Sequence, residues 1–261
     1  MKQISKRREK NIIRRKIKGI LVVFFLTIIF ILWTIYSILQ SDLLNLKKIE
    51  VFGNVLLTED EIIEESKLYL SRNIFQYNLL EIGDNVAKNP FVKDAEVKRK
   101  LPNSMMITVK EREKYAIIPY MGSFIYIDSS QVVLQASNEY LGEDLVLITG
   151  VEFQGFKLGD KIDINNSQLF DTALQLIEAS RISSIIEMIS EINIGNKDYI
   201  QLITFDGIEV LLAADTDPAY SILALKEILN NLYTRNTKDL IIDMRYKGQT
   251  FVGNRKRWEE N

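Results

Sequence analysis

The sequence predicts an α+β protein with a single transmembrane helix, a β-α-α-β-β unit and a second strand-rich unit with two helices. Three observations support this class. Twenty consecutive uncharged residues, mostly apolar, occupy positions 20–39. Downstream, short stretches alternate apolar and polar residues between turn residues, which is typical of half-buried strands. Other stretches repeat apolar residues at spacings of three and four, as amphipathic helices do.

Charge is unevenly distributed along the 261 residues, whose formal net charge is only -2. Residues 1–19 hold nine cations and one acid, a net of +8, which leaves -10 for the rest. The near-neutral total argues against a protein devoted to nucleic acid, because phosphate binding needs a cationic excess. The absence of Cys and His excludes disulfides, thiol nucleophiles, imidazole bases and the common zinc sites. Carboxylate chemistry stays possible, but nothing in the sequence singles out a pair of carboxylates and no Gly-rich phosphate loop appears. We expect no catalytic residue, cofactor, metal or small-molecule substrate.

The apolar stretch 20–39 predicts a membrane anchor. As a helix it reaches about 30 Å, the thickness of the hydrocarbon core of a bilayer. A cleaved signal peptide is the alternative, but its apolar region would be shorter and end in a small-residue cleavage site. Here Trp33 and Tyr36 stand near the exit end. We expect Ile20, Trp33, Tyr36 and Leu39 to hold the chain in the lipid bilayer.

The basic residues predict the orientation of this anchor. Cations that flank a first helix stay in the cytoplasm, so 1–19 is expected to be a basic cytoplasmic tail and 40–261 to be extracytoplasmic. The tail would set orientation and contact anionic headgroups; a nucleic-acid role for so short an arm is the weaker alternative.

A compact unit is expected from 46 to 115. Residues 48–52 alternate like a strand and stop at the turn pair Gly53-Asn54. Thr58 and Glu61 have the spacing of a capping box, which predicts a helix to about Leu70.

A second helix is expected from Asn78 to the Asn89-Pro90 pair, because Pro disfavours helical geometry at the preceding residue. Two strands follow, 92–100 and 104–111, around Pro102-Asn103. Phe75 and Tyr77 are expected in the core. A small sheet in this β-α-α-β-β order can bury one face beneath two helices while its edges stay available to another chain's strand.

Four stretches of this unit carry a resemblance to a known family: Gly53-Asn54 after a strand, 89–97, 101–104 and 109–112. Together they resemble a POTRA domain, a polypeptide-transport-associated module. A POTRA domain directly after such an anchor is similar to the FtsQ/DivIB family of bacterial cell-division proteins. Lys114 stands where the family usually has a Pro, whereas Ala116 matches the family pattern.

The second unit is expected to span 116–254. Its expected strands are 124–128 and 131–134 around Ser129-Ser130, then 145–150, 189–194, 199–205, 208–212, 238–245 and 249–253. One helix begins at Ser167 and another at Asp217-Pro218, with Asp as cap and Pro at the first helical position, running to about Tyr233. Asp206-Gly207 predicts a type I′ hairpin turn.

The closing strands extend the resemblance. The family's Ile/Val-Asp-Leu/Met-Arg-Tyr motif is matched by Ile242, Asp243, Met244, Arg245 and Tyr246, and Val252-Gly253 ends the last strand. The resemblance implies a non-enzymatic divisome scaffold that binds FtsB/DivIC-like and FtsL-like bitopic partners, its last strand receiving a partner strand. It places the partner contacts at Tyr246, Gly248, Gln249, Phe251 and Val252. Some members carry an aromatic residue where this chain has Asn254, a contact that Phe251 or Trp258 could replace.

Asp243 and Arg245, one residue apart on one strand face, are expected to pair with neighbours rather than bind a ligand.

The resemblance implies a place in the inner (plasma) membrane at the division septum. Two other functions stay open: a membrane-anchored cell-wall hydrolase that uses carboxylates, and a POTRA-type secretion component, which would need a long β-barrel. Residues 255–261 are expected to form a flexible tail.

Overall fold

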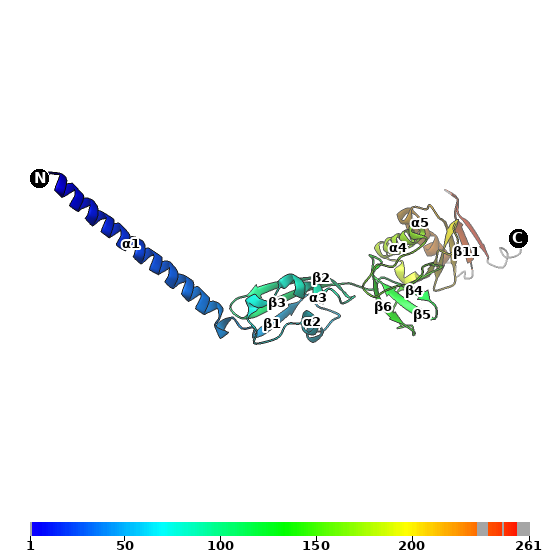
Figure 1. Ribbon diagram of the computed structural model, residues 1–261. Helices are drawn as coiled ribbons and strands as arrows, with labels where there is room; N and C mark the ends of the chain where they lie inside the picture. The colour runs from blue at the N-terminus through cyan, green and yellow to red at the C-terminus, as the bar shows by residue number, and fades with distance from the viewer. Residues whose placement is uncertain (1, 234–239, 247, 255–261) are drawn as a thin grey trace. The chain divides into compact units, whose positions relative to one another are not determined.

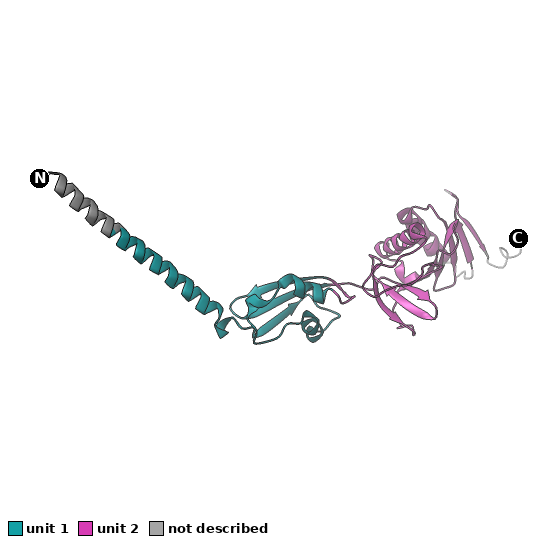
Figure 2. Ribbon diagram, in the orientation of Figure 1, with its two compact units in different colours: residues 1–87, 94–110 teal, residues 88–93, 111–261 magenta. Residues whose placement is uncertain are grey.

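The computed structural model describes residues 2–233, 240–246 and 248–254 (Figure 1). The expected tail, 255–261, lies outside the described residues. The chain divides into two compact units (Figure 2): unit 1 comprises 1–87 and 94–110, and unit 2 comprises 88–93 and 111–261. Helices and strands occur in both, so the predicted α+β class is confirmed.

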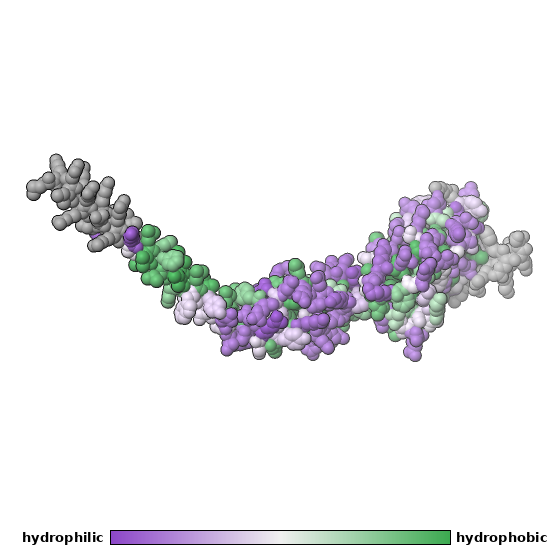
Figure 3. All heavy atoms as spheres, viewed as in Figure 1, coloured by the Kyte–Doolittle hydropathy of each residue, from purple (hydrophilic) through white to green (hydrophobic). Residues whose placement is uncertain are grey.

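The first element is one long helix, α1 (Lys2–Leu39), of 38 residues. The sequence predicts a helix only at 20–39, but no Pro interrupts the chain before it, and the helix extends back through the basic segment. Its 22 residues from Lys18 to Leu39 are long and apolar enough to cross a membrane, with a mean hydropathy of 2.6 over an 18-residue window. Most of this stretch is green in Figure 3. The expected anchor residues Ile20, Trp33, Tyr36 and Leu39 are all exposed.

The remainder of unit 1 has the expected order of elements. They are a 3-10 turn η1 (Asp42–Leu44), β1 (Lys48–Phe52), α2 (Glu59–Ser66), a second 3-10 turn η2 (Ile74–Gln76), α3 (Leu79–Val86), β2 (Val92–Lys100) and β3 (Ser104–Glu111). The sheet order is β1-β3-β2, with β1 parallel to β3. Alternate residues of β3 are buried, as predicted: Met105, Ile107 and Val109. They pack in a core with Ile62 of α2 and with Ile82 and Val86 of α3, which are also buried.

The capping box at the start of α2 forms as expected. The Thr58 hydroxyl accepts a hydrogen bond from the Glu61 backbone N–H (3.3 Å), and a Glu61 carboxylate oxygen accepts one from the Thr58 N–H (2.8 Å). The predicted end of α2 at Leu70 is wrong. Lys67 adopts a left-handed conformation (φ 54°), and the Ser66 hydroxyl accepts from the Leu68 N–H, so the helix stops at Ser66.

Two further features of unit 1 concern packing. Phe75, expected in the core, is 49% exposed, whereas Tyr77 is buried as predicted. The reason is that η2 turns Phe75 outward while the Tyr77 hydroxyl donates to the backbone oxygen of Tyr69 (2.6 Å).

Helix α3 approaches β2 closely at Gly83, where an added Cβ would lie 2.8 Å from the backbone oxygen of Ala95. Only glycine fits that approach without a shift of the backbone.

Unit 2 is built on one nine-stranded sheet. Its strands are β4 (Ala116–Tyr120), β5 (Ser123–Ile127), β6 (Val133–Ser137), β7 (Val146–Thr149), β8 (Ile189–Asn193), β9 (Tyr199–Thr204), β10 (Glu209–Ala213), β11 (Leu240–Met244) and β12 (Phe251–Asn254). The order across the sheet is β12-β11-β10-β9-β8-β7-β4-β5-β6. The β7–β8 and β10–β11 pairs are parallel.

The β4–β7 pair is also parallel and is connected through β5 and β6. The two helices of unit 2 make the crossovers of the β7–β8 and β10–β11 pairs. Helix α4 (Ser167–Ile182) connects β7 to β8, and α5 (Pro218–Tyr233) connects β10 to β11, with the 3-10 turn η3 (Ile186–Met188) before β8. The helices lie side by side (Figure 1) and share one apolar core with the sheet. Helix α5 begins as predicted, because the Asp217 carboxylate accepts from the Tyr220 N–H (2.9 Å) and Pro218 takes the first helical position.

The hairpin between β9 and β10 is confirmed, but its predicted type I′ turn is wrong. Type I′ requires positive φ at both central residues. Only Gly207 has positive φ here (81°), and Asp206 does not. Across three intervening residues the Thr204 N–H donates to the Ile208 oxygen (3.0 Å), and the Ile208 N–H donates to the Thr204 hydroxyl (3.0 Å). This is the three-residue loop with a left-handed glycine at its end.

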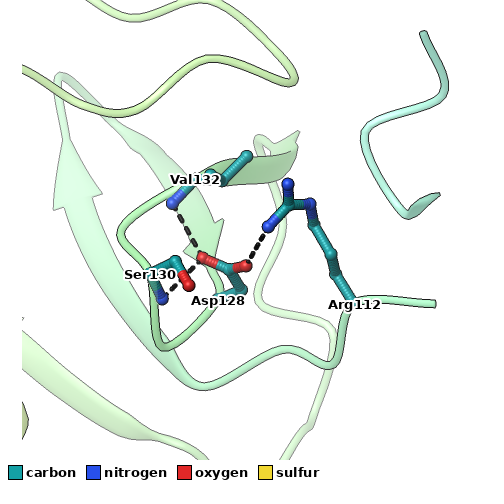
Figure 4. Close-up of polar contacts among 4 residues, drawn as sticks. All are labelled: Arg112, Asp128, Ser130 and Val132. Atoms are coloured by element: carbon teal, nitrogen blue, oxygen red, sulfur yellow. Dashed lines mark hydrogen bonds and ion pairs between the residues drawn. The ribbon is translucent and has the colours of Figure 1, made fainter. Parts of the chain in front are cut away.

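A buried ion pair fixes the turn between β5 and β6 (Figure 4). Arg112 donates to the Asp128 carboxylate at 2.7 Å, with side chains only 18% and 6% exposed. The other Asp128 oxygen accepts from the N–H groups of Ser130 and Val132, each at 2.8 Å. Gln131 between them has positive φ (70°). The turn is therefore longer than expected, and the second strand of the hairpin covers 133–137 instead of 131–134.

Candidate partner-binding edge

Strand β12 is the outermost strand at one end of the unit 2 sheet. It runs antiparallel to β11, with Asp243 opposite Phe251 and Ile242 opposite Val252. No other strand within the described ranges pairs with its outer side. The row of residues Phe251–Asn254 contains neither Pro nor a charged side chain, the usual features that protect an edge from strand addition.

The opposite edge, β6, differs because a loop partly covers it. The Val133 N–H donates to the Asp160 oxygen (3.0 Å), and the Gly159 N–H donates to the Val133 oxygen (2.8 Å). Val132 also forms an isolated antiparallel bridge with Lys161. The two ends of one sheet thus provide an open edge and a partly covered edge for comparison.

An ion pair sets the conformation where β11 ends. Arg245 donates twice to the Asp243 carboxylate, from Nε at 2.9 Å and from Nη2 at 2.7 Å, and its backbone N–H donates to the same group at 3.1 Å. Asp243 is 1% exposed. The Arg245 hydrogen bonds hold the pKa of the Asp243 carboxyl below its ordinary value, although burial opposes them. The two residues pair with each other, whereas the sequence predicted only that they would pair with neighbours rather than bind a ligand.

The expected contact residues come together around the turn from β11 to β12. The Gln249 N–H donates to the Tyr246 oxygen (3.1 Å), and Gly248 has φ 75°, a conformation that favours glycine. The Tyr246 and Phe251 rings meet edge to face, with centroids 6.1 Å apart. Tyr246, Phe251 and Val252 remain about half exposed. All five residues that the resemblance implied therefore lie on one exposed strand and its turn.

A groove beside this turn adds residues that sequence reasoning missed. It has a volume of about 470 Å³ and lies between the turn and the start of α5, with Tyr220, Asp215 and Asp217 in its wall. Tyr220 is exposed. In the sequence, Asp217-Pro218 indicated only a helix start. The signal that could have identified the groove in the sequence is Tyr220, an aromatic residue in the first turn after this helix cap.

The chemistry of this site is that of backbone pairing and apolar contact. An edge strand offers free N–H and C=O groups, and two half-exposed apolar residues beside an aromatic pair can select a partner side chain. Among the residues that the structure describes, no group of three or more carboxylates could hold a metal ion.

Taken together, these features define a class of protein: a helix able to span a membrane, a POTRA-like unit and a mixed-sheet unit with an open edge strand. Comparison with known families agrees with this class. Residues 44–112 match the model of the FtsQ-type POTRA domain, and residues 116–245 match that of the C-terminal domain of cell division protein FtsQ/DivIB. The chain belongs to the FtsQ/DivIB family, which confirms the resemblance seen in the sequence.

Similar proteins carry the same names. The chain is 34% identical to a cell division protein DivIB of Clostridium acetobutylicum over 131 residues, 50% of this chain and 53% of that one. It is 29% identical to DivIB of Clostridium tetani over 220 residues, 80% of this chain and 78% of that one. The match thus spans about half the length of the first relative and more of the second. A solved extracytoplasmic domain of DivIB from Geobacillus stearothermophilus aligns with 49% of this chain and 99% of its own, at 15% identity and a TM-score of 0.29.

Proposed function

We propose that this protein is a non-enzymatic, membrane-anchored scaffold of the bacterial division complex. Its β12 edge binds FtsB/DivIC-like and FtsL-like bitopic proteins and so links early to late division proteins at the septum. The observation that carries the proposal is the position of β12, an uncharged outermost strand with half-exposed Phe251 and Val252. A partner strand would continue the sheet through backbone hydrogen bonds.

Side chains around the edge would give this contact its specificity. The Tyr246–Phe251 ring pair and Val252 offer an apolar surface, while Gly248 and Gln249 shape the turn beside it. Aromatic residues at the centre of an interface often carry much of its binding energy. The groove lined by Tyr220 lies next to this surface and can accept a partner segment that continues beyond the paired strand.

The charge asymmetry supports an orientation with the N-terminus in the cytoplasm and both units outside the plasma membrane. Residues 1–19 carry a net charge of +8, and cations flanking a first transmembrane helix stay inside. In this orientation the β12 edge faces the compartment that the extracytoplasmic segments of bitopic partners occupy.

The test is a binding measurement with the full chain in detergent and the two partners. Val252→Lys places a charge on the half-exposed edge strand. We expect it to weaken binding at least 30-fold, about the effect of losing one hot-spot side chain. The matched control is Ala136→Lys, which puts the same charge on an exposed position of the opposite edge strand, β6. Equal affinities for the two variants would contradict the proposal.

A second experiment separates the scaffold from a wall hydrolase. Depletion of the protein in its native cell is expected to cause filamentation or failed septation. Unchanged division with altered wall fragments would favour the hydrolase instead.

A further inference from the structure

One end of unit 1 lies close to the end of the membrane helix. Only three residues, 40–42, separate Leu39 from Leu43, so their Cα atoms are at most about 14 Å apart even when the chain is extended. The loop 67–77 is tied to the chain that leaves the helix: the Leu46 N–H donates to the Arg72 oxygen (2.9 Å), and the Ser71 N–H donates to the Leu46 oxygen (2.8 Å). The β2–β3 turn joins the same end, because the Lys47 N–H donates to the Asn103 oxygen (2.8 Å). We call segments 40–48, 67–78 and 98–103 the proximal end.

The proximal end exposes large apolar side chains that unit 1 does not use for its own core. They come from all three segments and are between 49% and 66% exposed: Leu43, Tyr69, Leu70, Phe75 and Leu101. The other end of the unit also exposes apolar side chains, at Phe52, Val55 and Leu56. The proximal end is singled out because its apolar group is combined with positive charge. Aromatic residues with a polar tip, such as Tyr69, are favoured at the interface between lipid and water.

The charge of the proximal end has one dominant sign. Its three segments contain seven cations and one carboxylate, Asp42, which accepts a hydrogen bond from Asn45 (2.8 Å). Three of these cations pair with carboxylates just outside the segments, Lys48 and Lys100 with Glu50 and Lys98 with Glu96. The other end of the unit differs, since the loop after β1 leads into three acidic residues in the first turn of α2. The exposed cations of the proximal end include Lys47 and Arg72. An anionic lipid surface attracts such groups within a Debye length.

Backbone and ring contacts keep this end in a fixed conformation. Arg99 donates to the backbone oxygens of Ile74 (2.9 Å) and Tyr77 (2.6 Å) and lies over the Phe75 ring at 5.5 Å. Because these contacts order the backbone of the loop, docking on a surface costs little further backbone entropy. The conformation that would contact lipid is thus already formed in the free unit.

From these observations we propose that the proximal end of unit 1 docks on the headgroup region of an anionic bilayer, into which α1 inserts. The apolar side chains enter the boundary between headgroups and acyl chains, and Lys47 and Arg72 face lipid phosphates. The bilayer is the occupant that both the short connection to α1 and the charge favour. This surface is separate from the β12 edge, so the inference does not rest on the partner contacts proposed above.

The test uses the full chain in bilayer discs of phosphatidylglycerol and phosphatidylcholine. The sequence has no Cys, so a single Leu70→Cys variant carries an environment-sensitive probe without background. Val55→Cys is the matched control, because Val55 is an 88% exposed apolar residue at the other end of the unit. Lipids with a nitroxide quencher near the headgroup are expected to quench the probe at residue 70 strongly and the probe at residue 55 weakly. Similar quenching at both positions would contradict docking.

Two further arms separate docking from simple tethering. A Gly/Ser insertion of about eight residues after Gln40 adds a reach of about 15 Å. Docking predicts that quenching at residue 70 persists, whereas a fall to the residue 55 level would show that the short connection alone caused it. Lys47→Gln is expected to lower the ratio of docked to free unit about fivefold. Lys110→Gln makes the same change near the far end of β3 and is expected to leave this ratio unchanged. Unaltered quenching in discs of phosphatidylcholine alone would refute the role of anionic lipid.

Discussion

The ion pair between Asp243 and Arg245 gives the most quantitative prediction. Arg245→Met removes both side-chain hydrogen bonds at 2.9 and 2.7 Å and leaves the carboxylate of Asp243, 1% exposed, without its cation. Breaking a buried pair from one side costs about 3 to 5 kcal/mol. The Arg245 side chain is 31% exposed, so water screens part of the loss and the lower value, about 3 kcal/mol, applies. For a unit of this size that corresponds to a fall in Tm of about 6 to 12 °C.

Calorimetry of the full chain in detergent measures this shift in the transition of unit 2. Asp243→Asn in the Arg245→Met background is the control, because the neutral amide no longer needs a cation. We expect the double variant to regain much of the lost Tm. The reasoning would be refuted by an Arg245→Met transition within about 2 °C of the parent protein, or by a double variant no more stable than the single one.

Three other predictions concern the same fold. Arg112→Met should destabilise unit 2 by about 3 kcal/mol by leaving Asp128 buried without its cation, and denaturant unfolding that matches the parent would contradict it. Because Arg245 lowers the folded-state pKa of Asp243, this carboxylate stabilises unit 2 above its unfolded pKa of about 3.9, and that stability is lost as pH falls through the lower folded value. Asp243→Asn should therefore reduce the pH dependence of unfolding below about pH 4, and an unchanged acid titration would argue against it. Gly83→Ala should lower the free energy of unfolding of unit 1 by about 1 to 3 kcal/mol, because the added Cβ meets the Ala95 oxygen. This loss should outweigh the higher helix propensity of Ala. Urea unfolding that shows a more stable variant would contradict the prediction and indicate that α3 can move.

Much of the local structure could be predicted because its signals are local. The capping box at Thr58, the Asp217-Pro218 helix start and the alternation along β3 each depend on a few neighbouring residues. Two errors were local as well, the end of α2 and the type of the β9–β10 turn. Another arose where contacts between strands decided the outcome. Residues 116–120 were not among the expected strands, yet they form β4. Pro119 is tolerated there because β7 pairs only with Ala116 and Ile117, so no neighbour needs its missing N–H.

The site shows the same division between local and distant information. The motif ending in Tyr246 identified the strand, and family resemblance implied that the last strand is an edge, but no periodicity reveals the order of strands in a sheet. The position of β12 depends on the crossover by α5, which places β11 parallel to β10 and leaves β12 outermost. Tyr220 joins the groove through the same crossover. The Arg112–Asp128 pair, sixteen residues apart, had no sequence signal of its own.

Hydrogen exchange of the full chain with and without its bitopic partners tests the central claim most directly. Strand addition at β12 would give partners to its outward N–H groups, so exchange in Phe251–Asn254 should slow when the partners bind. Exchange in Val133–Ser137, the opposite edge of the same sheet, should not change. Unchanged exchange in β12, or equal protection of both edges, would contradict the account.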